Sequence, residues 1–280
     1  MKVIKTADGI IQAVAEAHRS GLSVGFVPTM GALHQGHLSL VRAASETCGL
    51  VVVSIFVNPT QFNDPEDLRR YPRDLEGDLR LLEKERTDLV FAPDVKEIYP
   101  EPDTRIFDLH PLDQVMEGRF RPGHFNGVAQ VVSRLFELVN PDVAFFGRKD
   151  FQQLTIIRRL VGILGLKVRI VGCPIIRESD GLAMSSRNQL LSREERAAAP
   201  HISQVLREAT ELTGKMKPEE LVTWVTTAVN KHPLLQVEYF EIVDDELLMP
   251  VTDWEQKVNK VGCIAVHLGK VRLIDNMVFA

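Results

Sequence analysis

The chain has 280 residues, of which 45% are hydrophobic and 25% are charged, and this composition is typical of a soluble globular protein. Its formal net charge of −5 argues against nucleic acid as a partner, because proteins that bind it usually carry a basic excess. The sequence has neither a signal-peptide pattern nor an apolar run of membrane-spanning length, and its three cysteines are far apart, so we expect a cytoplasmic protein with reduced thiols and no membrane partner.

Short apolar runs alternate with helical patterns in the first 175 residues. The runs are rich in Val, Ile and Phe, as is typical of parallel strands that are buried on both faces. This alternation predicts an α/β fold, a Rossmann-like doubly wound parallel sheet. The expected strands cover residues 24–27, 50–57, 88–92, 143–146 and 167–172, and the expected helices cover residues 8–19, 38–46, 65–85, 126–139 and 150–164.

The pattern changes after Pro174. Helices are expected first, and short strands follow, the last two of them separated by a Gly-Lys turn. This order predicts a smaller α+β domain, so we expect a Rossmann-like domain over residues 1–175 and a C-terminal domain over residues 176–280. The expected helices cover residues 192–212 and 218–230, and the expected strands cover residues 237–243, 262–268 and 271–274.

The stretch "VPTMGALHQGH", residues 27–37, lies where the first strand ends and the next helix begins. A helix N-terminus attracts phosphate, and His34 and His37 would lie on the same side of its first turn. Gly31 and Gly36 would let the backbone approach the ligand closely. The motif therefore predicts a polyphosphate site. For an isolated H-x-x-H, structural or surface histidines are the ordinary interpretation, and a metal site is a further alternative.

The stretch "FFGRKDFQQ", residues 145–153, ends the fourth strand. In the usual strand order 3-2-1-4-5, the first and fourth strands are neighbours, and ligands bind in the crevice between their carboxyl ends. Lys149 and Asp150 would then face His34 and His37 across that crevice. A Lys-Asp pair by itself is more often a solvated surface feature, so this prediction depends on the strand order.

The stretch "DGLAMSSRN", residues 180–188, lies at the expected domain junction. Small hydroxyl residues beside an arginine, in a loop that contains glycine, are typical of a mobile anion clamp. A polar linker is the alternative interpretation of this stretch.

These three motifs, in this order, resemble the nucleotidyltransferase superfamily, which includes class I aminoacyl-tRNA synthetases. With "VSIFVNPTQF", "YPRDLEGDL" and "RPGHFNGV", nearly the whole chain is similar to the pantoate–β-alanine ligase family. The resemblance implies that ATP, pantoate and β-alanine are the substrates. Pantothenate, AMP and pyrophosphate would be the products, formed through a pantoyl adenylate. It also implies a homodimer. Because an acyl adenylate hydrolyses in water, the site must close, and we expect the C-terminal domain to serve as the lid.

The resemblance assigns roles to individual residues. Catalysis is expected from His34, His37, Lys149 and Arg187, which we expect to supply positive charge, His37 also being the usual proton donor. Pantoate would contact Gln61 and Gln153, and β-alanine would contact Gln61. The expected ATP site consists of Met30, Gly31, Ala32, Leu33, His34, Gln35, Gly36, His37, Gly147, Arg148, Lys149, Asp150, Ile176, Met184, Ser185, Ser186 and Arg187.

The chain departs from the family pattern at three positions. Arg148 stands where an acidic residue often precedes the lysine, and Thr60 stands where methionine is common. Gly77 occupies a position that is often acidic in the family and implicated in Mg²⁺ binding, which leaves Asp78 as the single candidate protein ligand to Mg²⁺. We therefore expect Mg²⁺ to be bound mainly by ATP phosphate oxygens and water.

Two other functions remain open from the sequence. One is a nucleotidyltransferase that keeps the nucleotidyl group on its product, and the other is a nucleotide sensor without catalytic activity. An aminoacyl-tRNA synthetase is disfavoured by the acidic net charge.

Overall fold

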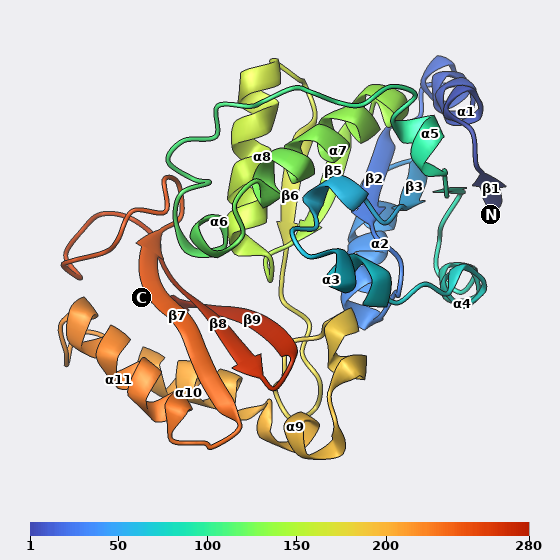
Figure 1. Cartoon of the computed structure of the whole chain (residues 1–280). Coiled ribbons are helices and arrows are strands. Elements are labelled where there is room, and N and C mark those ends of the chain that lie inside the picture. Colours follow the sequence, from blue (N-terminus) through green and yellow to red (C-terminus); the bar gives the residue numbers. More distant parts are fainter. Residues whose placement is uncertain (280) are drawn as a thin grey trace.

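The computed structural model describes residues 1–279, and in them the expected doubly wound sheet is present (Figure 1). Its strand order is β1-β4-β3-β2-β5-β6, and every neighbouring pair is parallel. The five expected strands, β2 to β6, therefore have the predicted order 3-2-1-4-5. The bounds are Lys2–Ile4 for β1, Val24–Thr29 for β2, Leu50–Ile55 for β3, Leu89–Phe91 for β4, Val143–Gly147 for β5 and Arg169–Cys173 for β6. The sequence did not predict β1, because three residues are too few for a periodic signal.

Both faces of this sheet are buried, as the apolar strands predicted. Side chains alternate along β3, so that Val52 belongs to one core cluster while Val51 and Val53 belong to another. The first cluster includes α1 (Ala7–Arg19), α7 (His124–Val139) and α8 (Phe151–Leu164), and the second includes α2 (Gln35–Thr47) and α4 (Leu75–Leu82).

Prolines interrupt two expected helices. The pattern over residues 65–85 forms two helices, α3 (Pro65–Arg70) and α4, because Pro72 disfavours the helical conformation in Tyr71 before it. The pattern over residues 192–212 forms α9 (Arg193–Ala198) and α10 (His201–Thr210), which are separated at Pro200. Short helices also lie at α5 (Val95–Ile98) and α6 (Met116–Phe120), and 3₁₀ turns at η1 (Pro59–Gln61) and η2 (Ser186–Leu190).

The C-terminal part has the expected antiparallel meander, β7 (Leu235–Asp244), β8 (Lys260–Leu268) and β9 (Val271–Phe279). Gly269 in the turn between β8 and β9 has φ of 56°, a conformation that favours glycine. The helices α10 and α11 (Pro218–Asn230) cover one face of this sheet and share a core cluster with it (Figure 1). None of the described helices is long and apolar enough to cross a membrane.

The two sheets fall on either side of the expected boundary at residue 175, since β6 ends at Cys173 and β7 begins at Leu235. The cores do not separate as cleanly. Val243 of β7 and Cys263 of β8 belong to the cluster that packs against the larger sheet. The three-stranded sheet therefore contacts both halves of the chain, and the division at residue 175 stays a prediction.

Candidate active site

A cavity of ≈ 700 Å³ lies where the carboxyl ends of β2 and β5 meet the segment of residues 184–187. The order of the strands explains its position, because the chain crosses over in opposite directions from these two neighbouring strands. The structure therefore brings all three sequence motifs together. The predicted site residues that line the cavity are Met30, His34, Gly36, His37, Gln61, Gly147, Lys149, Asp150, Gln153, Ile176, Met184, Ser185, Ser186 and Arg187.

The other predicted ATP-site residues are outside this lining. Arg148 donates a hydrogen bond from Nε to the carbonyl oxygen of Gly172 at 3.1 Å. Gln35 accepts one from Arg42 at its Oε1, over 2.9 Å, on the exposed side of α2. The turn between β2 and α2 contains Gly31, Ala32 and Leu33. These residues set the conformation of the turn and do not line the cavity.

That turn is organised by Asp78, which projects from α4. The Oδ2 atom of Asp78 accepts a hydrogen bond from the backbone N–H of Ala32 at 3.0 Å, and its Oδ1 accepts one from Leu33 at 2.7 Å. Gly31 and Ala32 have φ of 81° and 50°, so the carboxylate holds two successive left-handed residues. A Cβ on Gly31 would lie 2.8 Å from Asp78 Oδ2, which means that this glycine makes room for Asp78 rather than for a ligand.

This geometry favours a structural role for Asp78 over the expected Mg²⁺ contact. The carboxylate is buried, and both of its oxygens accept backbone hydrogen bonds. Burial raises the pKa of Asp78, and the two backbone hydrogen bonds oppose that rise. The described residues contain no group of three or more His, Cys, Asp or Glu side chains that could hold a metal ion. The chain therefore does not fit a Mg²⁺ site built from protein ligands alone.

His34 and His37 begin α2 as a reciprocal cap. His34 is the N-cap residue, and its Nδ1 accepts from the N–H of Gly36 at 3.1 Å, while Nδ1 of His37 accepts from the N–H of His34 at 3.3 Å. Because both Nδ1 atoms accept, the proton of each neutral ring is on Nε2. Each histidine can thus offer one N–H donor to a ligand.

The same contacts explain Gly36. A Cβ on this residue would lie 2.8 Å from Cε1 of His34, so the glycine makes room for the histidine ring. The two imidazole rings pack together, with their centroids 4.1 Å apart.

Both histidines are uncharged at neutral pH. Burial and then the Lys149 charge lower the pKa of His34 to about 4, and burial and then His34 lower that of His37 to about 3. In the protein without a ligand, these rings therefore do not supply the positive charge that the sequence led us to expect. They provide oriented N–H dipoles, and the cations of the cavity come from other residues.

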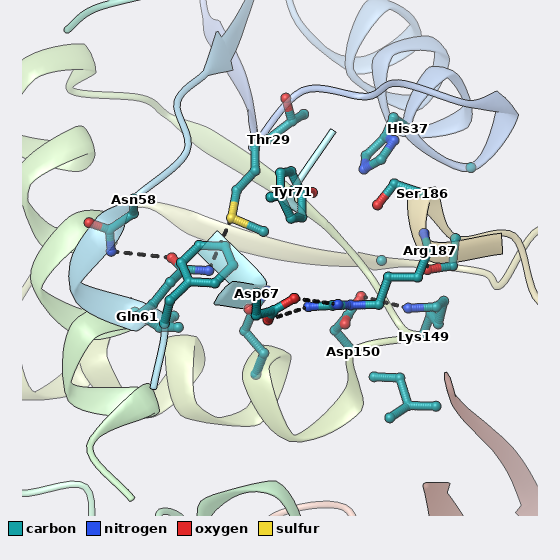
Figure 2. Close-up of a pocket in the computed structure, with 18 of the residues that line it drawn as sticks. Thr29, His37, Asn58, Gln61, Asp67, Tyr71, Lys149, Asp150, Ser186 and Arg187 are labelled. Atoms are coloured by element: carbon teal, nitrogen blue, oxygen red, sulfur yellow. Dashed lines mark hydrogen bonds and ion pairs between the residues drawn. The ribbon is translucent and has the colours of Figure 1, made fainter. Parts of the chain in front are cut away.

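The cationic end of the cavity contains Lys149 and Arg187 (Figure 2). Lys149 Nζ lies 3.5 Å from the carboxylate of Asp150. Arg187 makes a two-pronged pair with Asp67 of α3, at 2.7 and 2.8 Å. Burial by itself would raise the pKa of Asp67, but the hydrogen bonds and charge of Arg187 lower it overall, so this carboxylate stays ionised. The pair joins the 184–187 segment to α3.

Strand β9 of the C-terminal sheet binds the turn that carries Lys149 and also binds Arg177. Asn276 donates two hydrogen bonds from Nδ2, to the carbonyl oxygens of Arg148 and Lys149, each at 2.9 Å. Its neighbour Asp275 pairs with Arg177, at 2.6 and 2.9 Å. The backbone that carries Lys149 is therefore positioned by a residue more than a hundred positions away.

The other end of the cavity carries amides. Gln61 lies in η1, where its Oε1 accepts from Asn58 at 3.2 Å and its Nε2 donates to the sulfur of Met30 at 3.1 Å. A further amide, Gln153, lines the cavity from the first turn of α8, which follows the turn that carries Lys149 and Asp150. Figure 2 shows Asn58 and Gln61 on the opposite side of the site from Lys149 and Arg187.

Asn58, Asp67 and Tyr71 line the cavity but were not predicted. Asn58 and Tyr71 are part of the motifs "NPTQF" and "YPRDLEGDL", so a closer reading of those motifs could have found them. Asp67 carried no such signal, because its partner Arg187 is 120 positions away.

This arrangement suits a particular pair of ligands. Ammonium, guanidinium and imidazole N–H groups at one end can bind a polyphosphate. Amide groups at the other end can both donate and accept, which suits a small ligand that carries hydroxyl groups and a carboxylate. A carboxylate at the amide end would face the phosphates at the cationic end.

The family model for pantoate-beta-alanine ligase matches residues 2–278. A pantothenate synthetase from Porphyromonas gingivalis is 54% identical over 277 residues, which cover 99% of each chain. One from Bacteroides thetaiotaomicron is 53% identical, over 99% of this chain and 98% of the relative.

Solved structures agree with these similarities. The pantothenate synthetase of Thermus thermophilus superposes with a TM-score of 0.92 at 46% identity, and the match covers 99% of both chains. The pantoate-beta-alanine ligase of Francisella tularensis, complexed with beta-gamma ATP and beta-alanine, has a TM-score of 0.82 at 34% identity, over 99% of this chain and 97% of the other.

Proposed function

The chain belongs to the pantoate–β-alanine ligase family, and from this premise we propose that it condenses pantoate with β-alanine at the expense of ATP. The products are pantothenate, AMP and pyrophosphate, and the intermediate is an enzyme-bound pantoyl adenylate. The observation that supports this most is the two-ended cavity, with Lys149 and Arg187 on one side and Asn58 and Gln61 on the other.

In the first step an oxygen of the pantoate carboxylate attacks the α-phosphorus of ATP, and pyrophosphate leaves. The carboxylate is already ionised at neutral pH, so this step requires alignment and charge stabilisation rather than a base. Gln61 and Gln153 hold pantoate. Lys149 and Arg187 stabilise the charge that develops on the phosphates.

His34 and His37 contribute neutral N–H donors to the same phosphates. A neutral ring costs less to bury than a cation, and it is fixed in place by its Nδ1 hydrogen bond before the substrate arrives. A pKa of about 3 means that His37 is not already protonated at neutral pH, so we assign it stabilisation rather than proton donation.

In the second step the amine of β-alanine attacks the acyl carbon, and AMP leaves with the bridging oxygen. The amine must be neutral, and phosphate oxygens or water accept the proton that it loses. The adenylate would hydrolyse in water, so the 184–187 segment and the β8–β9 turn, which line the cavity from the C-terminal half, restrict access to it.

Exchange of labelled pyrophosphate into ATP, in the absence of β-alanine, tests the first step alone. The proposal predicts exchange that requires pantoate. Lys149→Ala should lower its rate by about 10²–10³-fold, while Lys167→Ala, at an exposed position, should leave it unchanged. Exchange that proceeds without pantoate, or no exchange under any condition, would contradict the proposal.

AMP release and the exchange assay together separate the two alternatives. A nucleotidyltransferase that keeps the nucleotidyl group on its product would release no AMP when β-alanine is added. A nucleotide sensor would bind ATP but would catalyse no exchange.

Three finer statements are part of the proposal. Mg²⁺ accompanies ATP and is bound mainly by phosphate oxygens and water, which is common for this ion. The family resemblance supports a homodimer and a cytoplasmic location. The three cysteines are free and buried, which suits a reducing compartment.

A further inference from the structure

The proposed reaction has a second carboxylate to recognise. β-Alanine carries one that does not react, and without a contact to it the site could not distinguish β-alanine from an uncharged amine. A cation that binds it must line the cavity and must have donors that the protein does not already use. This inference rests on the proposed function and adds a specificity residue to it.

Most of the buried cations in the cavity are already engaged. Arg272 of β9 donates from Nη1 and Nη2 to Glu117, at 2.8 and 2.6 Å, and from Nε to Glu238 at 2.9 Å. Arg187 pairs with Asp67, and Lys149 pairs with Asp150, and the proposed reaction already assigns both cations to the phosphates of ATP.

Arg121, the C-cap residue of α6, is the exception. Its side chain lines the cavity and is 26% exposed. Nη1 lies 3.2 Å from Nε2 of His124. Within the described part of the chain, the guanidinium makes no other hydrogen bond. The closest carboxylate oxygen, on Glu117, lies 3.6 Å away, beyond hydrogen-bonding distance, and that carboxylate is already bound by Arg272.

His124 connects Arg121 to the amide end of the site. Nδ1 of His124 lies 2.7 Å from the carbonyl oxygen of Gln61, and a carbonyl can only accept, so Nδ1 carries the ring proton. Nε2 is then an acceptor for Arg121. Burial, followed by the charge of Arg121, lowers the pKa of His124 to about 4, so the ring is neutral and the anion nearest to the Arg121 guanidinium is the carboxylate of Glu117, which Arg272 already binds.

A recess beside Arg121 has the size of a small anionic group. It is a cavity of ≈ 50 Å³ whose charged lining residues are Arg121, Lys149, Glu117, Asp150 and Asp275. Its volume holds a few water molecules or a carboxylate and is far too small for a nucleotide. The three carboxylates are already paired, Glu117 with Arg272, Asp150 with Lys149 and Asp275 with Arg177, so Arg121 is the cation of this recess without a close ion-pair partner of its own.

We propose that Arg121 binds the carboxylate of β-alanine through its free guanidinium nitrogens and so selects this amine for the second step. His124 orients the guanidinium and ties it to the η1 turn that carries Gln61. The amine of β-alanine can then point back toward the acyl group held by Gln61 and Gln153.

The test compares Arg121→Gln and Arg121→Lys with Arg119→Gln, whose side chain is 55% exposed on the same helix and pairs with Glu241. Each variant is assayed for pantoate-dependent pyrophosphate exchange without β-alanine, and for pantothenate formation. β-Alaninamide, which lacks the carboxylate, serves as the comparison amine. Thermal unfolding reports whether each variant is folded.

For Arg121→Gln we expect the KM for β-alanine to rise by about 30- to 100-fold, as the loss of a charge-assisted contact implies, while exchange stays within about threefold of the wild type. The preference for β-alanine over β-alaninamide should be lost. Arg121→Lys, which keeps the charge without the planar fork, should lie between, and Arg119→Gln should match the wild type.

An unchanged KM for β-alanine would overturn the inference. A rise in the KM for pantoate, or a loss of exchange equal to the loss of pantothenate formation, would also overturn it and would assign Arg121 to pantoate or to the fold. If the wild-type protein shows no pantoate-dependent exchange, the proposed function itself fails, which is a different result.

Discussion

Asp78→Asn tests how the chain builds the turn that carries the two histidines. The carboxylate accepts hydrogen bonds from Ala32 and Leu33, and both of these residues lie in the turn. An asparagine keeps one acceptor and places an NH₂ group against a backbone N–H, so one hydrogen bond is lost and buried donors are left unpaired. Hydrogen bonds to a charged group contribute about 1.5–3 kcal/mol each, and the unpaired donors add to that loss.

We therefore expect Asp78→Asn to lower the free energy of unfolding by about 2–4 kcal/mol, which corresponds to a Tm roughly 5–10 °C lower. The turn also holds Ala32 at φ of 50°, so its relaxation would move His34 and lower the exchange rate by about tenfold or more. Differential scanning calorimetry and the exchange assay measure the two effects. Glu76→Gln, whose side chain is 89% exposed on the same helix, is the control.

The same variant separates the structural role of Asp78 from a metal-ligand role. A residue that binds Mg²⁺ would, when removed, raise the Mg²⁺ concentration needed for half-maximal exchange and leave the Tm nearly unchanged. The structural role predicts the reverse. A raised Mg²⁺ requirement together with an unchanged Tm would refute the structural role.

Three further predictions concern the same site. His34 and His37 have lowered pKa values in the folded protein, so the unfolded chain binds more protons below pH 6.5. The free energy of unfolding should therefore fall by roughly 1–2 kcal/mol per histidine between pH 7 and pH 5. Urea unfolding at both pH values should show a smaller fall for His37→Gln than for the wild type, and an equal fall would contradict the low pKa. Gln153→Ala should raise the KM for pantoate with little effect on that for ATP, and an effect confined to ATP would reverse the assignment. Asn276→Ala should lower kcat and destabilise the fold by about 1–3 kcal/mol, because two carbonyl oxygens lose their donor. Asn276→Asp places oxygens against those carbonyls, so its kcat and stability should be lower still. Equal activity in both variants would argue against a positioning role.

Much of the fold followed from local patterns. Apolar runs rich in Val, Ile and Phe predicted β2 to β6, and because doubly wound sheets share one common strand order, they also predicted that β2 and β5 are neighbours. The errors were local too. Pro72 and Pro200 divide helices whose apolar periodicity continues across them, and β1 is too short to produce a pattern.

The composition of the site was predicted better than its electrostatics. The motifs indicated which side chains meet at the switch point, but no local signal shows that His34 and His37 are buried enough to stay neutral. The pairing of Arg187 with Asp67 and the hydrogen bonds from Asn276 join residues more than a hundred positions apart. Such contacts depend on the tertiary packing, so the protonation states and the positioning residues required the structure.

The central claim is that this site activates a carboxylate by joining it to AMP. Pantoate labelled with ¹⁸O in both carboxylate oxygens tests it directly, because attack on the α-phosphorus followed by aminolysis leaves one pantoate oxygen on the AMP phosphate. Mass spectrometry after complete turnover should therefore find AMP that carries one ¹⁸O atom. AMP without the label, or the label in inorganic phosphate, would contradict the claim.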